Sequence, residues 1–213
     1  MILPKKNKKG EYYVSYSQLS KWRRSKSEYF KQYFYNVPFK GNAYTDFGSK
    51  VGEALETGDF SGFSGVERTF IEIVPRLDEF EREVRLNFEG WHIKGYIDAN
   101  DATLTHIVDY KTGSVDKEDE YRSDKYDQIQ LYALAIEQET GVRPTKGEVL
   151  LIERTGNAFS GEELKLGSMI VHIEQPLDDK TMDRVKKEAE ETAKDISRHW
   201  EAFNYLIGKD VKG

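Results

Sequence analysis

Residues 95–98 read GYID and residues 107–113 read IVDYKTG, with a short polar turn between them. The apolar residues of both segments are spaced as in β-strands, and turns of this kind join neighbouring strands. Such a pair of strands can bring Asp98 and Asp109 together at one end of a sheet. Two carboxylates that meet there repel each other unless a cation lies between them. The segment therefore predicts a site for Mg²⁺ or Mn²⁺, which prefer oxygen ligands and retain waters.

Lys111 lies two residues after Asp109, so in a strand the two side chains share one face and Tyr110 points away. An ammonium beside a metal can orient an attacking water, help to deprotonate it, or stabilise the charge of a phosphoryl transition state. We predict that Asp98, Asp109 and Lys111 are catalytic. Two simpler interpretations stay open: Asp98 as a turn residue, and Lys111 as a structural ion-pair partner of Asp109.

Outward from this pair of strands, the spacing of apolar residues predicts further elements. The first helix is expected to begin after Ser17 as N-cap and to end before Pro38. Further helices are expected over residues 47–56, 126–140 and 181–207, and strands over residues 83–88, 91–99, 105–110, 148–153 and 168–174. We expect one α/β domain over residues 1–213, a central mixed β-sheet flanked by α-helices, with residues 1–11 as a flexible, basic arm.

Charge is unevenly distributed along the chain. The net charge is −6, but residues 1–50 hold eleven Lys and Arg against three Asp and Glu, and twelve of the 27 aromatic residues. The remaining residues therefore carry a net charge of −14. A basic, aromatic-rich segment joined to an acidic body is typical of a protein that binds phosphates at one place and metal at another. A positive surface over an aromatic core is the alternative interpretation.

The chain contains no cysteine, which excludes disulfides, zinc–thiolate sites and iron–sulfur clusters held by its own side chains. No apolar run is long enough to span a membrane, and the first residues lack the apolar core of a signal peptide. We therefore expect no membrane contact and a cytoplasmic setting, which includes a phage-encoded protein acting in its host.

The residues described so far resemble a known family. Asp98, with Asp109 and Lys111 as Asp-x-Lys, is similar to the active-site signature of the PD-(D/E)XK nuclease superfamily. The stretch IVDYKTG at residues 107–113 resembles the corresponding strand of the RecB-like branch. A Gln-x-x-x-Tyr pattern at residues 128–132 and SYSQL at residues 15–19 are similar to two more of its motifs, in the same order.

The resemblance implies a restriction-endonuclease-like fold that hydrolyses DNA phosphodiesters with Mg²⁺ or Mn²⁺. Asp98, Asp109 and the Tyr110 carbonyl would hold the metal, and Lys111 would position or activate the water. Gln128 and Tyr132 would brace the lysine side of the site and a nearby phosphate; a polar core contact at i,i+4 is their alternative role. Arg23 and Arg24 are candidate DNA contacts, with ordinary surface residues as the alternative.

Two positions depart from the family pattern. Where relatives carry a metal-binding histidine, this chain has Gly52. Side chains of a helix lean toward its N-terminus, so Glu56, one turn later, could supply an oxygen ligand in place of the histidine, with Glu53 as the competing candidate. The cysteine–proline pair of iron–sulfur relatives is replaced by Ser25-Lys26, which is typical of the branch without a cluster.

The function implied is a metal-dependent deoxyribonuclease, with an exonuclease acting on free DNA ends in recombination, repair or phage DNA metabolism as the leading form. DNA, single- or double-stranded, is the expected partner, together with a possible recombination or replication protein. Three alternatives stay open: a structure-selective or nicking endonuclease, a DNA-binding module that has lost catalysis, and RNA as substrate.

Overall fold

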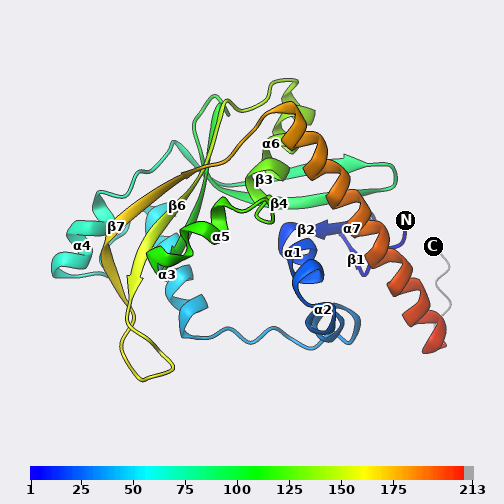
Figure 1. Cartoon of the computed structure of the whole chain (residues 1–213), viewed down its shortest axis with the longest axis horizontal. Coiled ribbons are helices and arrows are strands. Elements are labelled where there is room, and N and C mark those ends of the chain that lie inside the picture. Colours follow the sequence, from blue (N-terminus) through cyan, green and yellow to red (C-terminus); the bar gives the residue numbers. More distant parts are fainter. Residues whose placement is uncertain (209–213) are drawn as a thin grey trace.

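The protein is described here by a computed structural model that covers residues 1–208. Its strands and helices follow one another in short runs along the chain, and a long helix comes last (Figure 1). In chain order they are β1 Lys5–Lys6, β2 Tyr12–Ser15, α1 Tyr16–Arg24, α2 Lys26–Tyr29, the π-helical turn η1 Phe30–Phe34, α3 Ala43–Thr57, α4 Gly65–Glu72, β3 Glu79–Phe88, β4 Trp91–Asn100, β5 His106–Gly113, the 3₁₀ turn η2 Val115–Lys117, α5 Glu118–Arg122, α6 Gln128–Thr140, β6 Lys146–Thr155, β7 Lys165–Glu174 and α7 Asp179–Leu206.

The strands form one seven-stranded sheet in the order β1-β2-β4-β5-β6-β7, and β3 pairs with the other edge of β4. The sheet is mixed, because β2 and β4 are parallel, as are β5 and β6, whereas the remaining pairs are antiparallel. α6 packs on the sheet, and α7 packs on α6 and α1, around a large apolar core; α3 lies beside β4 and β5, and α4 beside β7 (Figure 1). The predicted fold class, a central mixed β-sheet flanked by α-helices, is confirmed.

One edge of β4 is shared by two strands. β2 pairs with its first residues, up to Lys94, and β5 pairs with its last, Ala99 and Asn100. Residues 95–98 lie between the two partners and pair with neither of them. The sheet therefore opens at this point, and the opening falls on the GYID segment.

The first helix differs from the expected one. Ser15, rather than Ser17, is the N-cap, and its hydroxyl accepts a hydrogen bond from the Gln18 N–H. The helix also ends early, because Ser25 adopts an extended backbone and caps a second, short helix. A serine hydroxyl that binds nearby backbone N–H groups competes with helix continuation, which explains the break.

Residues 1–11 are not the free arm that the sequence suggested. Leu3 is only 2% exposed, and the backbone N–H of Ile2 donates to Ser197 Oγ on α7 at 3.2 Å. Lys5 and Lys6 add a short strand beside β2. The apolar residues at the start of the chain bury surface against α7, and this burial outweighs the polarity of the lysines that follow.

Several elements were shorter in the prediction or absent from it. β3 begins at Glu79 instead of residue 83, and the capping box of Asn42 and Thr45 starts α3 four residues before the expected position. The short elements β2, α4 and α5 were not predicted.

In residues 1–208, no helix combines the length and apolarity that crossing a bilayer requires.

Candidate active site

Asp98 and Asp109 lie where β4 and β5 diverge. The pairing of Ala99 with Val108 puts Asp98 opposite Asp109 at the next position, just beyond the last paired residues. The carboxylate of Asp98 accepts a hydrogen bond from the Tyr110 N–H at 2.8 Å, which links the two strands by a side chain where backbone pairing stops. The structure thus brings together the two acids that the sequence singled out.

Asp109 is fully buried, and only one of its oxygens is satisfied. Oδ2 lies 2.5 Å from Lys111 Nζ and accepts a hydrogen bond from the Tyr126 hydroxyl at 2.7 Å. Oδ1 has no hydrogen-bond partner although it is buried. An unpaired carboxylate oxygen in the interior is costly, and cation binding is a common way to remove that cost.

The charges of the site affect one another. Burial and the neighbouring Asp109 charge raise the pKa of Asp98 to about 7, despite the opposing effect of Lys111. Burial would lower the pKa of Lys111, but the negative charges of Asp109 and Asp98 outweigh this and raise it. The lysine therefore stays protonated, and the two carboxylates share a single compensating positive charge.

A cleft of about 500 Å³ opens beside these groups, between α3 and the ends of β3, β4 and β5. Asp98 and Lys111 line it, as do the Tyr110 and Thr112 positions. Glu56 and Gly52 of α3 line its opposite wall, whereas Glu53 is exposed and is not part of the lining. An added side-chain carbon at Gly52 would meet nothing within 4 Å, so the position where relatives carry histidine faces open space.

Glu81 is a site residue that the sequence interpretation missed. It lines the cleft next to Asp98, and burial together with the charge of Glu56 raises its pKa. Its backbone φ of 50° is rare for a residue other than glycine, and such strained positions concentrate at functional sites. The strand was expected to begin only at residue 83, so Glu81 was not assigned to the sheet.

Among residues 1–208, no three His, Asp or Glu side chains are already placed to hold a metal ion. Mg²⁺ usually takes one or two protein carboxylates and keeps several waters, so a closed protein cage is not required. The unpaired oxygen of buried Asp109 and the carboxyl groups of Asp98 and Glu81 make an oxygen-rich donor set that fits such an ion. A bound cation would also relieve the repulsion that helps to raise the pKa of Asp98.

Gln128 and Tyr132 reach the site through Tyr126. The amide of Gln128 donates to the Tyr132 hydroxyl at 3.0 Å, and its Oε1 lies 3.2 Å from the Tyr126 hydroxyl. Tyr126 in turn contacts Asp109, so the chain of contacts ends at a site carboxylate. Both residues of the Gln-x-x-x-Tyr pattern are buried, and Tyr126, which the sequence interpretation passed over, joins them to Asp109.

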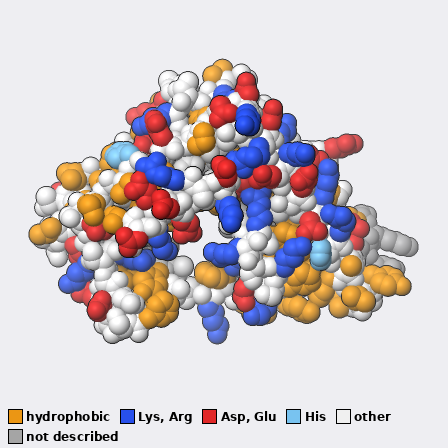
Figure 2. Space-filling view, viewed as in Figure 1, with side chains coloured by type: hydrophobic (Ala, Val, Ile, Leu, Met, Phe, Trp, Pro, Cys, Tyr) orange, Lys and Arg blue, Asp and Glu red, His pale blue; other side chains and the backbone are white. Residues whose placement is uncertain are grey.

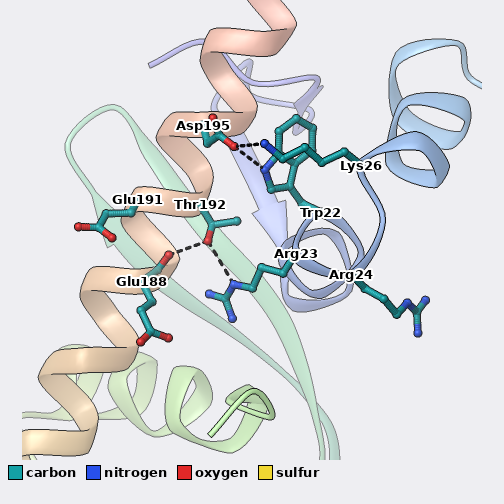
Figure 3. Close-up of a pocket in the computed structure, with 8 residues that line it drawn as sticks. All are labelled: Trp22, Arg23, Arg24, Lys26, Glu188, Glu191, Thr192 and Asp195. Carbon is teal, nitrogen blue, oxygen red and sulfur yellow. Dashed lines mark hydrogen bonds and ion pairs between the residues drawn. The ribbon is translucent and has the colours of Figure 1, made fainter.

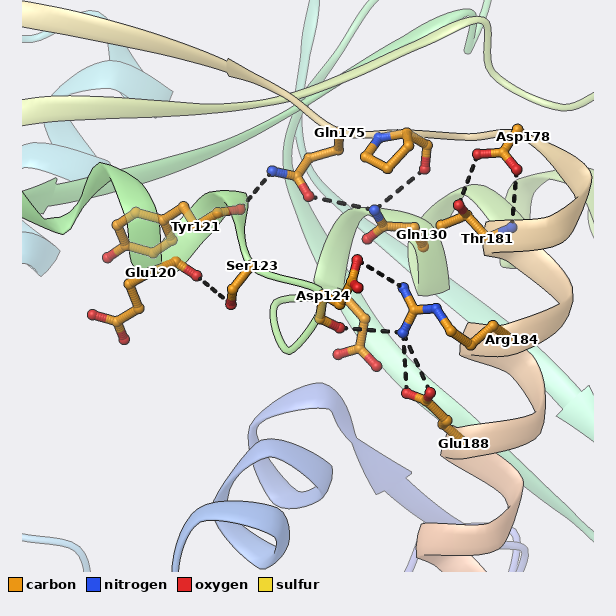
Figure 4. Close-up of polar contacts among 12 residues, drawn as sticks. Glu120, Tyr121, Ser123, Asp124, Gln130, Gln175, Asp178, Thr181, Arg184 and Glu188 are labelled. Carbon is orange, nitrogen blue, oxygen red and sulfur yellow. Dashed lines mark hydrogen bonds and ion pairs between the residues drawn. The ribbon is translucent and has the colours of Figure 1, made fainter.

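The loop that carries Tyr126 is held by polar contacts from both sides (Figure 4). Gln175 after β7 donates to the Tyr121 carbonyl at 2.8 Å, and Arg184 of α7 donates to the Asp124 carbonyl at 3.2 Å. Glu188, one turn along α7, in turn lies 3.2 Å from the Arg184 guanidinium. These contacts fix the backbone around Tyr126 and therefore the position of its hydroxyl.

Gly95 allows Tyr132 to approach β4. A side-chain carbon added at Gly95 would lie 2.3 Å from Tyr132 Cε1. Gly95→Ala is therefore expected to displace the tyrosine ring, to destabilise the protein by about 1–3 kcal/mol and to lower the melting temperature by about 2–4 °C per kcal/mol. Thermal unfolding of the variant measures this.

Gly52→Ala is the matched control for Gly95→Ala, because nothing lies within 4 Å of the methyl group it adds. It should not lower the melting temperature, since alanine also favours helix over glycine. An unchanged melting temperature for Gly95→Ala would contradict the tight contact with Tyr132.

Arg23 and Arg24 have different surroundings. The Arg23 guanidinium pairs with buried Asp127 at 2.6 Å and donates to Thr192 on α7 at 3.1 Å. Figure 3 shows Arg23 pointing toward α7, whereas Arg24 points away from it. Trp22 is buried and donates to Asp195 at 2.9 Å. Arg23 thus has partners within the protein, and a DNA contact by either arginine stays a prediction.

Two solved exonuclease structures have a similar fold. A candidate exonuclease from Eubacterium rectale superposes with a TM-score of 0.56 at 15% identity, covering 90% of this chain and 82% of that chain. An alkaline exonuclease from Laribacter hongkongensis superposes with a TM-score of 0.51 at 14% identity, covering 92% and 93%. The structure of the same alkaline exonuclease in complex with dAMP superposes with a TM-score of 0.51 at 13% identity, again covering 92% of this chain and 93% of that chain. The protein has the α/β fold of these exonucleases.

The family follows from the sequence itself. The model of the PD-(D/E)XK nuclease superfamily matches residues 62–204, which contain β3 to β7 and both site aspartates. The chain belongs to the PD-(D/E)XK nuclease superfamily. No curated protein matches the sequence.

Proposed function

We propose that the protein is a Mg²⁺- or Mn²⁺-dependent deoxyribonuclease that hydrolyses phosphodiester bonds, most simply as an exonuclease. The observation that carries the proposal is the pair of half-buried Asp98 and buried Asp109, with one oxygen of Asp109 unsatisfied and Lys111 alongside. Membership of a nuclease superfamily supports it, and the likeness to two exonuclease structures supports the exonuclease form.

In this proposal Asp98, Asp109 and the Tyr110 carbonyl hold the metal, and Glu81 or Glu56 supplies a further oxygen. A bound Mg²⁺ polarises the phosphoryl group and neutralises the charge that develops on it. Lys111, protonated and anchored by Asp109, orients the attacking water and donates hydrogen bonds to the phosphoryl oxygens. Tyr126, Gln128 and Tyr132 act one step away, by fixing the carboxylate of Asp109.

Degradation of end-labelled linear DNA, single- and double-stranded, in Mg²⁺, in Mn²⁺ and in EDTA tests the proposal. A covalently closed circle is included because an exonuclease leaves it intact, whereas a structure-selective or nicking endonuclease cuts it. Metal-dependent release of nucleotides from linear DNA alone supports the exonuclease. If neither DNA form is degraded with either metal, the proposal is wrong and a DNA-binding role takes its place.

The third carboxylate can be assigned by matched glutamine variants. Glu81→Gln and Glu56→Gln remove a charge from the cleft wall, and Glu53→Gln removes one from the exposed face of the same helix as Glu56. We expect Glu81→Gln to raise the Mg²⁺ concentration for half-maximal activity about tenfold or more, in the range seen when a supporting group of a metal site is lost. Glu53→Gln should leave it unchanged.

If Glu56→Gln raised the Mg²⁺ concentration for half-maximal activity and Glu81→Gln did not, the third carboxylate would be Glu56, the α3 glutamate expected from the sequence. Equal shifts for all three variants would mean that only net charge matters. Metal titrations of activity, with the melting temperature as a check on folding, separate these results.

A further inference from the structure

A second hollow, of about 800 Å³, lies beside the cleft, between the start of α1 and β4. Asp98 and Glu81 line both hollows, so the two meet at the acidic end of the site. Figure 2 shows the molecule hollowed at its centre, with acidic side chains on one side and basic side chains on the other. We call the second hollow the α1–β4 groove and define it by Lys5, Tyr13, Lys21, Arg24, Lys94 and Tyr96.

The groove is basic away from the site. Four of its lining residues are Lys or Arg, and its two acids, Asp98 and Glu81, lie at the end that it shares with the cleft. Lys94 is paired with Glu83 at 2.9 Å. Within residues 1–208, Lys5, Lys21 and Arg24 make no ion pair with any carboxylate. Three positive charges in one groove are thus free to bind phosphates.

The start of α1 adds to this preference for anions. Residues 15–17, the N-cap and the first turn, line the groove, so the partial positive charge of the helix N-terminus faces it. Together with the free cations, this makes the groove suited to a chain of phosphates rather than to a neutral ligand.

The groove is also aromatic. Five tyrosines line it: Tyr13, Tyr16, Tyr33, Tyr96 and Tyr132. Tyr96 is 44% exposed and is therefore accessible to a ligand. Aromatic side chains beside cations bind single strands, because each unpaired base presents a face on which a ring can stack, whereas the base faces of a duplex are stacked on one another.

We propose that the α1–β4 groove binds one unpaired DNA strand next to the reaction site, with phosphates on Lys5, Lys21 and Arg24 and a base on the exposed ring of Tyr96. The inference rests on the proposed nuclease function for the identity of its ligand. It gives the protein a preference for single strands or for duplex ends that have opened, since the acidic end holds the phosphate to be cut and the basic groove holds its neighbours.

Binding measured in EDTA, where no strand is cut, tests the groove apart from catalysis. The probes are a fluorescein-labelled oligothymidine and a blunt hairpin duplex, followed by fluorescence anisotropy over a range of salt. We expect the wild-type protein to bind the single strand more tightly than the hairpin. The double variant Lys21→Ala/Arg24→Ala should weaken that binding about tenfold or more and reduce the slope of log K against log salt by about 1.4, since each phosphate contact on a single strand contributes about 0.7.

Lys186→Ala is the matched control, because Lys186 is exposed on α7 and lines none of the hollows. It should leave both affinity and salt slope unchanged. Tyr96→Leu should weaken binding of the single strand about tenfold, and Tyr96→Phe, which keeps the ring, should restore it.

Equal losses in Lys186→Ala and in the double variant, or tighter binding of the hairpin than of the single strand, would overturn the proposal. So would wild-type affinity in both groove variants. The two proposals fail separately: metal-dependent cleavage with unaltered binding in the groove variants retains the nuclease and rejects the groove. Binding that the groove variants weaken, without any cleavage of DNA, retains the groove and rejects the nuclease.

Discussion

Lys111→Ala is expected to lower the rate of DNA hydrolysis by about two to four orders of magnitude, the range seen when a group that acts on the reacting atoms is removed. Lys111 is the only side-chain cation within ion-pair distance of Asp109 in the described part of the chain. In the proposed function, its loss would take away both a donor to the phosphate and the group that positions the water. Single-turnover degradation of labelled linear DNA, at saturating Mg²⁺, measures the effect.

The same substitution removes one partner of a buried ion pair, which by itself destabilises a protein. Lys111→Arg is therefore the second variant, since it keeps a positive charge beside Asp109 but changes the shape of the donor. We expect it to retain the melting temperature better than Lys111→Ala while remaining strongly impaired in hydrolysis. Full activity of a folded Lys111→Ala protein would leave Lys111 with a structural role only.

Asp98→Asn is expected to act in opposite directions on activity and on stability. The asparagine can still accept the hydrogen bond from the Tyr110 N–H, but it carries no charge to bind a metal. Hydrolysis should therefore fall at least 100-fold. In EDTA at pH 8, however, the variant should be more stable than the wild type, because the desolvation of the Asp98 charge and its repulsion by Asp109 are both gone.

The pH dependence of this gain follows from the pKa of Asp98. Its pKa is about 7 in the folded protein and near 3.8 in the unfolded chain, so the wild type loses stability as the pH rises from about 4 through 7. The pKa difference corresponds to at most about 4 kcal/mol at pH 8. The melting temperature of the variant should exceed that of the wild type by roughly 3–10 °C at pH 8.

The difference in melting temperature should shrink as the pH falls from 7 toward 4, and adding Mg²⁺ should stabilise the wild type alone. Thermal unfolding of both proteins at pH 4, 6 and 8, in EDTA and in Mg²⁺, gives the comparison. If Asp98→Asn were less stable than the wild type at pH 8 in EDTA, the repulsion between the two acids would be weaker than the contacts that the Asp98 charge makes with Lys111 and the Tyr110 N–H.

The relative placement of the two acids and the lysine could be predicted from the sequence because it depends on residues close together in the chain. Alternation along a strand puts Asp109 and Lys111 on one face, and a short turn puts Asp98 opposite Asp109, whatever the rest of the chain does. Glu56 was placed on the cleft side of its helix for the same reason. The fold class followed from the order of periodic segments, which is also a local property.

The parts that were wrong or missed depend on contacts between distant residues. Leu3 is ordered by α7, nearly two hundred residues later, and nothing near it in the sequence indicates this. Glu81 reaches the cleft through an unusual backbone conformation that alternation does not anticipate. Tyr126 lies just before α6, outside the motif, and only the packing of that helix on the sheet brings it to Asp109.

The shared edge of β4 divides the sheet into two halves, with Asp98 in one and Asp109 in the other. Between β4 and β5 the register contains only two residue pairs, whereas β3 and β4, or β5 and β6, are paired along most of their length. An ion held by both acids would therefore act as an additional crosslink between the halves. That ion would restrain the two halves beyond the two backbone pairs and the Asp98–Tyr110 hydrogen bond, so that assembly of the reaction centre would also stiffen the sheet.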